Sequence, residues 1–373
     1  MASQTSTSLL LVGAGHAHLY LLRRAEDLIA AGYTVSLLAP EQFRYSGMAA
    51  ATATGVLPAH AGAIDVTALT ADGPVRHHVG MLSELDLARH RARCDDGQWL
   101  DFDVISFNIG SVAGRRGIDV GDDVVTVKPL EELADLDRRV TAALEALEDS
   151  HRNARVTIVG GGPSSIELAG NLACRESVEV NVIEAGSMIL PDLSDKARSR
   201  VARLLTSRGV RLHTGLGVTQ VEADRVVLSD GRILAHDVVT LATGLVASPL
   251  VETFGLGQTS DGQTSDGIPV GPSLQHPEYD EVYAAGDCAN FLPQPLARIG
   301  VYGVRQGPVL LASLVARASG HPVPQFRPQR HVLQVLDLGG GYGLAIRGRW
   351  WWLGRMSLRL KRWIDRRWMA NYA

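Results

Sequence analysis

The same pattern occurs twice in this chain: an apolar strand, a glycine-rich turn, a helix and a second apolar strand. In the first copy the strand covers residues 8–12, the turn is Gly13-Ala14-Gly15, a helical pattern runs to about residue 30, and the second strand covers 34–39. In the second copy the strand covers 155–159, the turn is 160–162, the helix runs to about residue 174, and the next strand covers 178–183. The copies lie about 147 residues apart, which is too far for a solenoid repeat. The repeat therefore predicts an α/β fold with two domains, each built on a parallel sheet.

The first turn has most of the residues that a dinucleotide requires. Gly13 permits the tight turn, and Gly15 lets backbone N–H groups approach a pyrophosphate at the helix N-terminus. His18 replaces the third glycine of the usual pattern, and we expect it to loosen the packing of helix against strand. The acid that would bind a ribose is also missing, because Ala39 ends the second strand; Glu41 is the candidate to replace it.

The second turn fits the pattern more closely. Gly160 and Gly162 are in place, Pro163 follows, and Ser165 is a small residue at the third position. Glu184 ends the next strand, where a carboxylate accepts hydrogen bonds from a ribose diol and repels a 2′-phosphate. This turn therefore predicts an NAD(P)H site that prefers NADH.

A third motif identifies the other cofactor. Residues 282–289 form an apolar strand followed by Gly286-Asp287-Cys288, and two further apolar strands end at Gly110 and Gly244. In this order the motifs resemble those of the pyridine nucleotide-disulfide oxidoreductase superfamily, over residues 8 to 316. The resemblance implies two Rossmann-like domains, with an FAD domain split around an inserted NAD domain. It also implies that Asp287 bonds the ribityl chain of FAD.

Within that superfamily the chain is most similar to type II NADH dehydrogenases, and more narrowly to a flavoprotein module found fused to selenide, water dikinase. The residues that carry this similarity are 13–18, 45–48, 127–129, 301–308 and the tail from 348. The resemblance implies that 44–48 and 302–306 line the isoalloxazine and the acceptor pocket. The residues expected at the FAD site are Gly13, Gly15, His16, Glu41, Arg44, Gly110, Gly286, Asp287 and Cys288. Those expected at the NAD(P)H site are Gly160, Gly162, Pro163, Glu184 and Gly244.

The expected chemistry is hydride transfer from NADH to FAD, with electrons passed on to a quinone or a similar small acceptor. The expected catalytic residues are Tyr302, Gln306 and Glu167. Glu167 is a candidate to orient the nicotinamide amide, and the alternative is that it is an ordinary surface glutamate. The three cysteines are far apart and predict neither a redox disulfide nor a zinc site. Reduction of a ferredoxin or rubredoxin, or a flavin-binding sensor without efficient turnover, remain alternative functions.

Histidine pairs do not lead us to predict a metal site. His16 and His18 lie in the nucleotide turn, and the rings of His77 and His78 point apart if the pair lies on a strand.

The C-terminal segment differs in charge from the rest of the chain. Residues 347–373 contain eight Arg or Lys and one Asp, a net charge of +7, so the remainder carries −11 of the total of −4. Apolar residues recur at helical spacing between Met356 and Trp368, and Trp among basic residues is typical of a helix that lies on an anionic membrane. Packing on the chain itself or on a second subunit is the alternative.

The sequence also leads to expectations on location and domain boundaries. The chain lacks the charged head and cleavage pattern of a signal peptide, so we expect a cytoplasmic protein, with possible peripheral contact with the membrane through 349–368, a possible homodimer and no nucleic-acid partner. The expected domains are residues 1–115 and 246–330 for FAD, 116–245 for NAD(P)H, and 331–373 for a C-terminal hairpin and basic helix.

Overall fold

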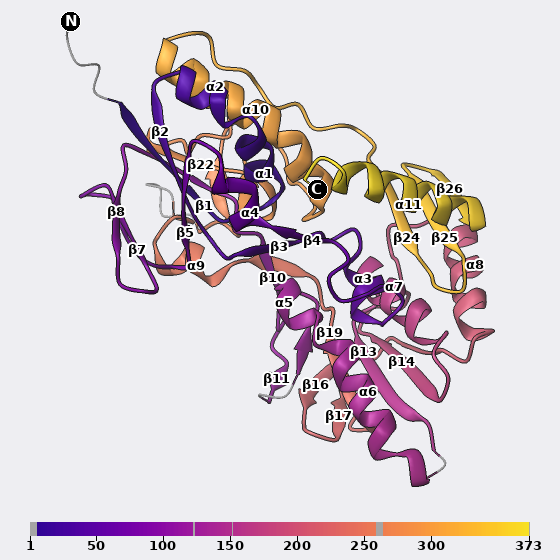
Figure 1. Ribbon diagram of the computed structural model, residues 1–373. Coiled ribbons are helices and arrows are strands. Elements are labelled where there is room, and N and C mark those ends of the chain that lie inside the picture. The colour runs from indigo at the N-terminus through magenta and orange to yellow at the C-terminus, as the bar shows by residue number, and fades with distance from the viewer. Residues whose placement is uncertain (1–5, 122–123, 151, 259–263, 373) are drawn as a thin grey trace, which may run out of the picture. The chain divides into compact units, whose positions relative to one another are not determined.

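The computed structural model describes residues 6–121, 124–150, 152–258 and 264–372 (Figure 1). The chain forms two compact units. The first unit consists of Met1–Phe43, Ala63–Ser111 and Val246–Gln329, and the second of Arg44–Gly62, Val112–Leu245 and Arg330–Ala373. Three of these boundaries lie within a few residues of the expected 115, 245 and 330. The segment 44–62 lies in the second unit, whereas we expected it to belong with residues 1–115.

The first unit is built on a parallel sheet in the order β22-β9-β1-β2-β5. Leu9, Leu10 and Leu11 of β1 are fully buried, because helices and further chain cover both faces of a central parallel strand. The elements of this unit are β1 (Thr7–Val12), α1 (His16–Arg23), α2 (Ala25–Ala30), β2 (Tyr33–Ala39), α4 (Val66–Ala71), β5 (Val75–Val79), β6 (Leu82–Asp86), β7 (Arg91–Cys94), β8 (Trp99–Asp101), β9 (Val104–Phe107), α9 (Pro249–Thr253), β21 (Ile268–Val270), β22 (Val282–Ala284), the 3-10 turn η2 (Gly286–Cys288), β23 (Ala289–Phe291) and α10 (Gly300–Ser319).

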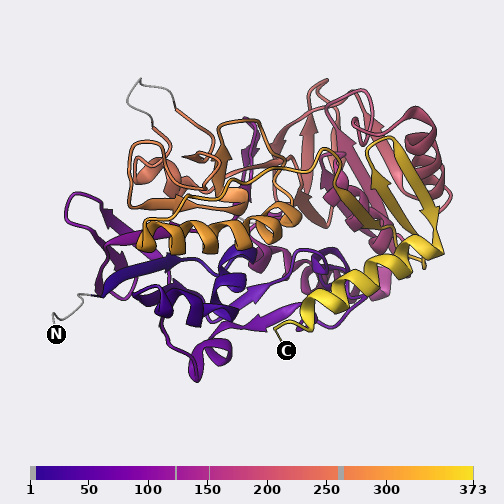
Figure 2. The same ribbon diagram turned by 90° about the horizontal axis from the view of Figure 1, so that it is seen from above.

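Helices α1 and α10 lie side by side on this sheet (Figures 1 and 2). Gly307 of α10 faces Tyr20 of α1, where an added Cβ would lie 2.8 Å from the Tyr20 Cβ, so glycine lets the two helices approach closely. Helix α10 ends at Ser319, and the next residue, Gly320, has a φ of +67°, the left-handed conformation that terminates many helices. The expected helix from residue 16 to 30 is interrupted at Arg24, where α1 ends and α2 begins.

The second unit repeats the plan with a parallel sheet in the order β12-β19-β13-β14-β15. Its elements are α3 (Ala49–Ala53), β11 (Asp119–Val120), β12 (Val125–Thr126), α5 (Leu130–Leu133), α6 (Leu136–Ala146), the 3-10 turn η1 (Glu148–Ser150), β13 (Ala154–Val159), α7 (Pro163–Leu172), β14 (Val178–Glu184), α8 (Asp195–Thr206), β15 (Arg211–Thr214), β16 (Val218–Val221), β17 (Arg225–Leu228), β18 (Ile233–Ala235), β19 (Val238–Leu241), β24 (Leu333–Asp337), β25 (Gly343–Arg347), β26 (Trp350–Gly354) and α11 (Arg355–Met369). The short strands β3 (Gln42–Arg44), β4 (Ala63–Asp65), β10 (Ser111–Ala113) and β20 (Leu245–Ala247) lie where the chain passes between units.

One expectation about this unit needs correction. The expected C-terminal hairpin is part of an antiparallel sheet in the order β24-β25-β26, because Trp350–Gly354 adds a strand. Before β13, the helical segment is divided into α5, α6 and η1, with an interruption at Ala134 and Asp135. Helix α11 lies against this sheet (Figure 2). No helix in the described ranges is both long enough and apolar enough to cross a bilayer.

Candidate functional site

The first glycine turn joins the carboxyl end of β1 to the N-terminus of α1. Gly13 has a φ of +83°, and a Cβ built on it would lie 2.7 Å from the carbonyl oxygen of Asn108. A Cβ on Gly15, the residue that precedes α1, would lie 2.6 Å from the same oxygen. Glycine is therefore required at both positions because the chain after β9 passes directly beneath the turn. The helix N-terminus above it has the dipole and the N–H donors that suit a pyrophosphate.

Asn108, which sequence reasoning did not single out, holds this turn together. Its side-chain oxygen accepts hydrogen bonds from the backbone N–H of Ala17 at 2.9 Å and of His18 at 3.2 Å. Its side-chain amide donates to the carbonyl oxygen of Ala285 at 2.6 Å, just before the Gly286 turn. The only signal in the sequence was an asparagine directly after a buried strand, which is too common to be diagnostic.

His18 does not loosen the packing of helix against strand, contrary to expectation. The side chain is fully buried, with Nδ1 2.6 Å from the carbonyl oxygen of Gly13 and Nε2 2.9 Å from Oγ of Ser106 on β9. Burial lowers the pKa of His18 to about 4, opposed by the bond to Gly13, so the ring is neutral at physiological pH. A neutral imidazole with one hydrogen donates from one nitrogen and accepts at the other, which satisfies both contacts.

The second motif expected at the FAD site, Gly286–Cys288, forms a 3-10 turn between β22 and β23. Gly286 has a φ of +73°, and its N–H donates to Oε1 of Gln306 at 2.6 Å. Oδ2 of Asp287 accepts a hydrogen bond from Oγ of Ser111 at 2.9 Å. Gln306 is 1% exposed and Tyr302 is partly buried on the same helix. The structure therefore shows Gln306 anchoring the Gly286–Asp287 turn to α10, whereas a role of either residue in catalysis stays a prediction.

Of the remaining residues expected at the FAD site, four belong to the first unit, whereas Arg44 belongs to the second unit, contrary to expectation. Cys288 is fully buried, and burial raises the pKa of its thiol to about 11. Glu41 is exposed just beyond β2, and its role as a ribose acceptor stays a prediction. His16 contacts Phe43 edge-on, with ring centroids 5.1 Å apart. A Cβ built on Gly110, whose φ is +76°, would meet no described atom within 4 Å.

The second glycine turn has the same design in the second unit. Gly160 has a φ of +116°, and a Cβ on it would lie 2.7 Å from the carbonyl carbon of Ala242. Gly162 precedes α7, Pro163 occupies the first turn of that helix, and Ser165 is fully buried. A Cβ built on Gly162 would meet no described atom within 4 Å, so this side of the turn is open to a ligand.

Glu184 lies beside this turn, as its position in the sequence suggested. One carboxylate oxygen accepts the N–H of Gly161 at 2.5 Å, and the other accepts the N–H of Gly186 at 2.6 Å. Each oxygen keeps a further lone pair for a ribose hydroxyl. Gly244 has a φ of +98°, and a Cβ on it would lie 2.8 Å from a guanidinium nitrogen of Arg116. Arg116 was not predicted from the sequence.

Glu167 faces the C-terminal sheet. Its carboxylate accepts the N–H of Asp337 at 2.7 Å, and Asn171 of the same helix donates to the Asp337 carbonyl oxygen at 3.2 Å. Burial raises the pKa of Glu167 to about 7. Gly170 and Gly339 allow the backbones to cross closely here, since a Cβ on Gly170 would lie 2.7 Å from the Leu338 carbonyl carbon. That Glu167 orients the nicotinamide stays a prediction.

The apolar residues of the tail do not form one face, contrary to expectation. On α11, Met356 is 49% exposed, Leu360 36% and Trp363 55%. Trp368 instead turns inward and stacks on Tyr45, with centroids 4.3 Å apart and an angle of 15° between the rings. On β26, Trp350 is 83% exposed and Trp352 is 56% exposed. We call Trp350, Trp352, Met356, Leu360 and Trp363 the outer tryptophan surface.

These residues fit two dinucleotides. Each unit places a glycine turn with a positive φ at the carboxyl end of a central parallel strand, followed at once by a helix N-terminus. Each unit also places carboxylate groups near its turn: Glu41 and Asp287 in the first unit, and Glu184 in the second. This is the arrangement expected of a dinucleotide site, in which backbone N–H groups bind the phosphates and carboxylates bind the sugar hydroxyls.

Known proteins share both the fold and the sequence pattern. The chain is similar to the internal alternative NAD(P)H-ubiquinone oxidoreductase A1 of Solanum tuberosum. The two are 30% identical over 184 residues, which cover 45% of this chain and 36% of that protein. The type II NADH:quinone oxidoreductase Ndh of Mycobacterium tuberculosis is 26% identical over 57% of this chain and 50% of its own length. The chain thus spans half or less of the length of these relatives.

A solved structure, NDH2 from Plasmodium falciparum in complex with NADH, matches the fold with a TM-score of 0.83 at 12% identity, over 96% of this chain and 97% of that one. The model of the pyridine nucleotide-disulphide oxidoreductase family matches residues 7–308. The relatives resemble the expected type II NADH dehydrogenases, and none of these findings bears on a selenide, water dikinase fusion. With most of the chain matched, the protein belongs to the pyridine nucleotide-disulphide oxidoreductase family, and FAD and NAD(P)H are its cofactors.

Proposed function

We propose that this protein is an NADH dehydrogenase that passes electrons through FAD to a quinone or a similar small acceptor. The observation that carries the proposal is the pair of turns, with Asp287 beside one and Glu184 beside the other. FAD supplies the chemistry, since it accepts a hydride and gives up electrons. The chain supplies the N-termini of two helices, α1 and α7, to bind the pyrophosphates, and carboxylates to bind the sugar hydroxyls.

Glu184 supports NADH over NADPH. Its two oxygens are already fixed by the N–H groups of Gly161 and Gly186, so the carboxylate cannot turn away from a ligand in this turn. A fixed negative charge accepts the hydrogen bonds of a ribose diol and repels a 2′-phosphate.

The cysteines support an acceptor other than a disulfide. Each of the three is a free thiol. Cys288 is the one that lies next to a predicted flavin-binding residue, and its raised pKa keeps it a protonated thiol at neutral pH, whereas thiol–disulfide exchange requires a thiolate. The names of the relatives, which include ubiquinone and quinone oxidoreductases, agree with a quinone acceptor.

The test separates the two half-reactions. Purified protein with bound FAD is mixed anaerobically with NADH, and the visible absorbance of the flavin is followed; a soluble quinone is then added. We expect NADH to bleach the flavin and quinone to restore it. A flavin that NADH leaves oxidised would contradict dehydrogenase activity and favour the sensor alternative. A reduced flavin that quinone cannot reoxidise but a ferredoxin or rubredoxin can would favour the protein-acceptor alternative.

We also propose that the outer tryptophan surface binds an anionic membrane. Apolar side chains of this surface point outward among the arginines of α11. In a helix that only packs on its own domain, the apolar side chains would face inward instead. Trp350→Ser and Trp363→Ser together should reduce sedimentation with vesicles that contain phosphatidylglycerol. Ile233→Ser, which removes a side chain 62% exposed on β18, is the matched control. Equal sedimentation of the double variant and wild type would show that this surface has another role.

A further inference from the structure

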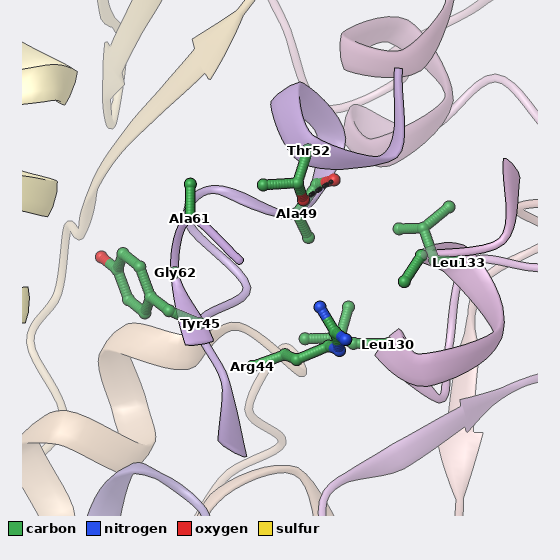
Figure 3. Close-up of a pocket in the computed structure, with 9 residues that line it drawn as sticks. Arg44, Tyr45, Ala49, Thr52, Ala61, Gly62, Leu130 and Leu133 are labelled. Atoms are coloured by element: carbon green, nitrogen blue, oxygen red, sulfur yellow. Dashed lines mark hydrogen bonds between the residues drawn. The ribbon is translucent and has the colours of Figure 1, made fainter. Parts of the chain in front are cut away.

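One cavity among the described residues of the second unit is too small for a cofactor. The segment 44–62 lines it together with Leu130 and Leu133 of α5 and the following Ala134 (Figure 3). The cavity has room for about one water molecule, and a nicotinamide ring needs several times that space. A dinucleotide of this unit must bind instead at the open carboxyl edge of the parallel sheet.

The order of the strands indicates where the two halves of that dinucleotide lie. Strand β13, which leads into the glycine turn, pairs with β14 on one side and with β19 on the other. Glu184 ends β14, so the adenosine half is expected on that side. The nicotinamide half is then expected on the side of β19, over Thr243 and Gly244. The turn touches this stretch, since a Cβ on Gly160 would lie 3.2 Å from the backbone nitrogen of Thr243.

The side chain of Arg116 lies on the same stretch. Its Nε donates to the carbonyl oxygen of Thr243 at 2.5 Å, and its Nη2 lies 2.8 Å from the position of a Cβ on Gly244. The backbone before Arg116 is also tied to this stretch. The N–H of Gly114 donates to the carbonyl oxygen of Gly244 at 2.9 Å, and the Thr243 hydroxyl donates to the carbonyl oxygen of Gly114. The guanidinium is therefore held at the carboxyl end of β19.

The backbone of Arg116 adopts a conformation that is unusual for a residue with a side chain. Its φ is +47°, and the φ of Gly117 is +76°. The N–H of Ile118 donates to the carbonyl oxygen of Arg115 at 2.9 Å, which closes a four-residue turn around this pair. Asn or Gly would occupy the first central position of such a turn at lower cost. An arginine in this conformation points to a role of its side chain.

The charge of Arg116 is accessible to a ligand. The residue is exposed, and in the described ranges no carboxylate is paired with its guanidinium. NADH and NAD⁺ differ at the nicotinamide ring, which is neutral in NADH and positively charged once a hydride has left. Two positive charges about 6 Å apart, at an effective dielectric constant of about 40 to 80, repel each other enough to change affinity about three- to tenfold.

We propose that Arg116 is a specificity-determining residue of the NADH site: its guanidinium, beside the nicotinamide half, disfavours the charged ring of NAD⁺ and so favours the substrate over its own product. The same repulsion assists the release of NAD⁺ after hydride transfer. This inference rests on the proposed function, because weak binding of NAD⁺ benefits an enzyme that takes hydride from NADH.

The experiment measures dissociation constants on the full-length protein with oxidised FAD, by the change in flavin absorbance. The ligands are NAD⁺, the 1,4,5,6-tetrahydro analogue of NADH and ADP-ribose. The analogue has an uncharged ring that cannot give up a hydride, and ADP-ribose lacks the ring and so measures any contribution of Arg116 to pyrophosphate binding. In Arg116→Gln we expect the ratio of the NAD⁺ constant to the analogue constant to fall about three- to tenfold.

Further variants separate charge from structure. Arg116→Lys keeps the positive charge and should keep most of the ratio. Arg116→Gly suits the left-handed backbone, so it should lose the ratio as Arg116→Gln does, with little change in melting temperature. Arg115→Gln removes the neighbouring exposed arginine and is the matched control, for which we expect the wild-type ratio. Because salt screens exposed charges, the difference between wild type and Arg116→Gln should shrink in about 0.5 M salt.

The outcomes distinguish this inference from the proposed function. Equal weakening of all three ligands in Arg116→Gln and Arg116→Gly, with an unchanged ratio, would overturn the selection against NAD⁺ and leave hydride transfer to FAD intact. A wild-type flavin that NADH cannot reduce would overturn the proposed function. The two results are independent, because none of the three ligands reduces the flavin.

Discussion

Acidification should destabilise the first unit through one histidine. The His18 ring is fully buried between the carbonyl oxygen of Gly13 and the hydroxyl of Ser106, and it can keep both contacts as a neutral ring. A protonated ring has two donors, and its charge would be buried with a single carbonyl to stabilise it. His18→Gln replaces it with a group of comparable length that does not titrate.

The magnitude follows from the pKa. Burial lowers the pKa of His18 from 6.5 to about 4. The unfolded chain therefore takes up a proton before the folded one does, and the contribution of His18 to stability is complete above about pH 6.5 and lost as the pH falls toward 4. At 1.36 kcal/mol per pKa unit the full loss is about 3 kcal/mol, and at pH 5 it is about 2 kcal/mol.

The assay is urea unfolding of the flavin-loaded protein between pH 7.5 and pH 5, with release of flavin as the report on the first unit. At pH 7.5 we expect His18→Gln to be less stable than wild type by about 1–3 kcal/mol, because it packs less well than the ring. This difference should shrink by about 2 kcal/mol at pH 5. His321→Gln, at an exposed histidine of the same unit, is the control. A difference that stays constant or grows on acidification would refute the reasoning.

Four further substitutions or modifications test other parts of the structure. Glu184→Ala should raise the kcat/KM ratio of NADPH to NADH about tenfold or more in steady-state assays, because the 2′-phosphate no longer meets a carboxylate. Burial raises the pKa of Glu167 to about 7, so its cost to stability appears as the pH rises from about 4.5 through 7; Glu167→Gln should stabilise the protein at pH 8 by up to about 3 kcal/mol in urea unfolding. Gly170→Ala should lower the melting temperature, at a cost of about 1–3 kcal/mol, because its Cβ would meet the backbone of the C-terminal sheet at 2.7 Å. Iodoacetamide should modify the exposed Cys174 well before the buried Cys288, as mass spectrometry of digests would show, and the reverse order would contradict the burial described.

Local patterns in the sequence predicted the two parallel sheets and the glycine turns. A buried strand followed by a glycine turn is recognised from a few consecutive residues. The turns at Gly13 and Gly160, both of which have a positive φ, could therefore be predicted without any tertiary information. The position of Glu184 could be predicted in the same way, because it is the last residue of the strand that follows the second turn and its helix. The expected role of Asp287 came instead from the resemblance to a family, and Glu41 was a candidate because Ala39 stands where an acid was expected.

Contacts between distant segments could not be predicted in this way. His18 looked like a defect because Ser106, its partner on β9, is 88 residues away. The hydrogen bond between the Tyr45 hydroxyl and Asp365 of α11 spans 320 residues, so nothing local indicated that the inner side of α11 is polar. Asn108 is similar, since its three hydrogen bonds involve α1 and the chain before Gly286. The third strand of the C-terminal sheet, β26, was missed, because the tryptophan run before the helical pattern was not assigned to a strand.

The interleaving of the two units along the chain has a consequence for synthesis on the ribosome. The parallel sheet of the second unit uses strands between residues 125 and 214 and is completed by β19 at 238–241, whereas the first unit lacks its edge strand β22 until residue 284 has emerged. Because β22 pairs with β9, that buried strand has one open edge during most of translation. The sheet of the first unit therefore cannot be completed until about three quarters of the chain has been synthesised, although its first residues leave the ribosome before all others.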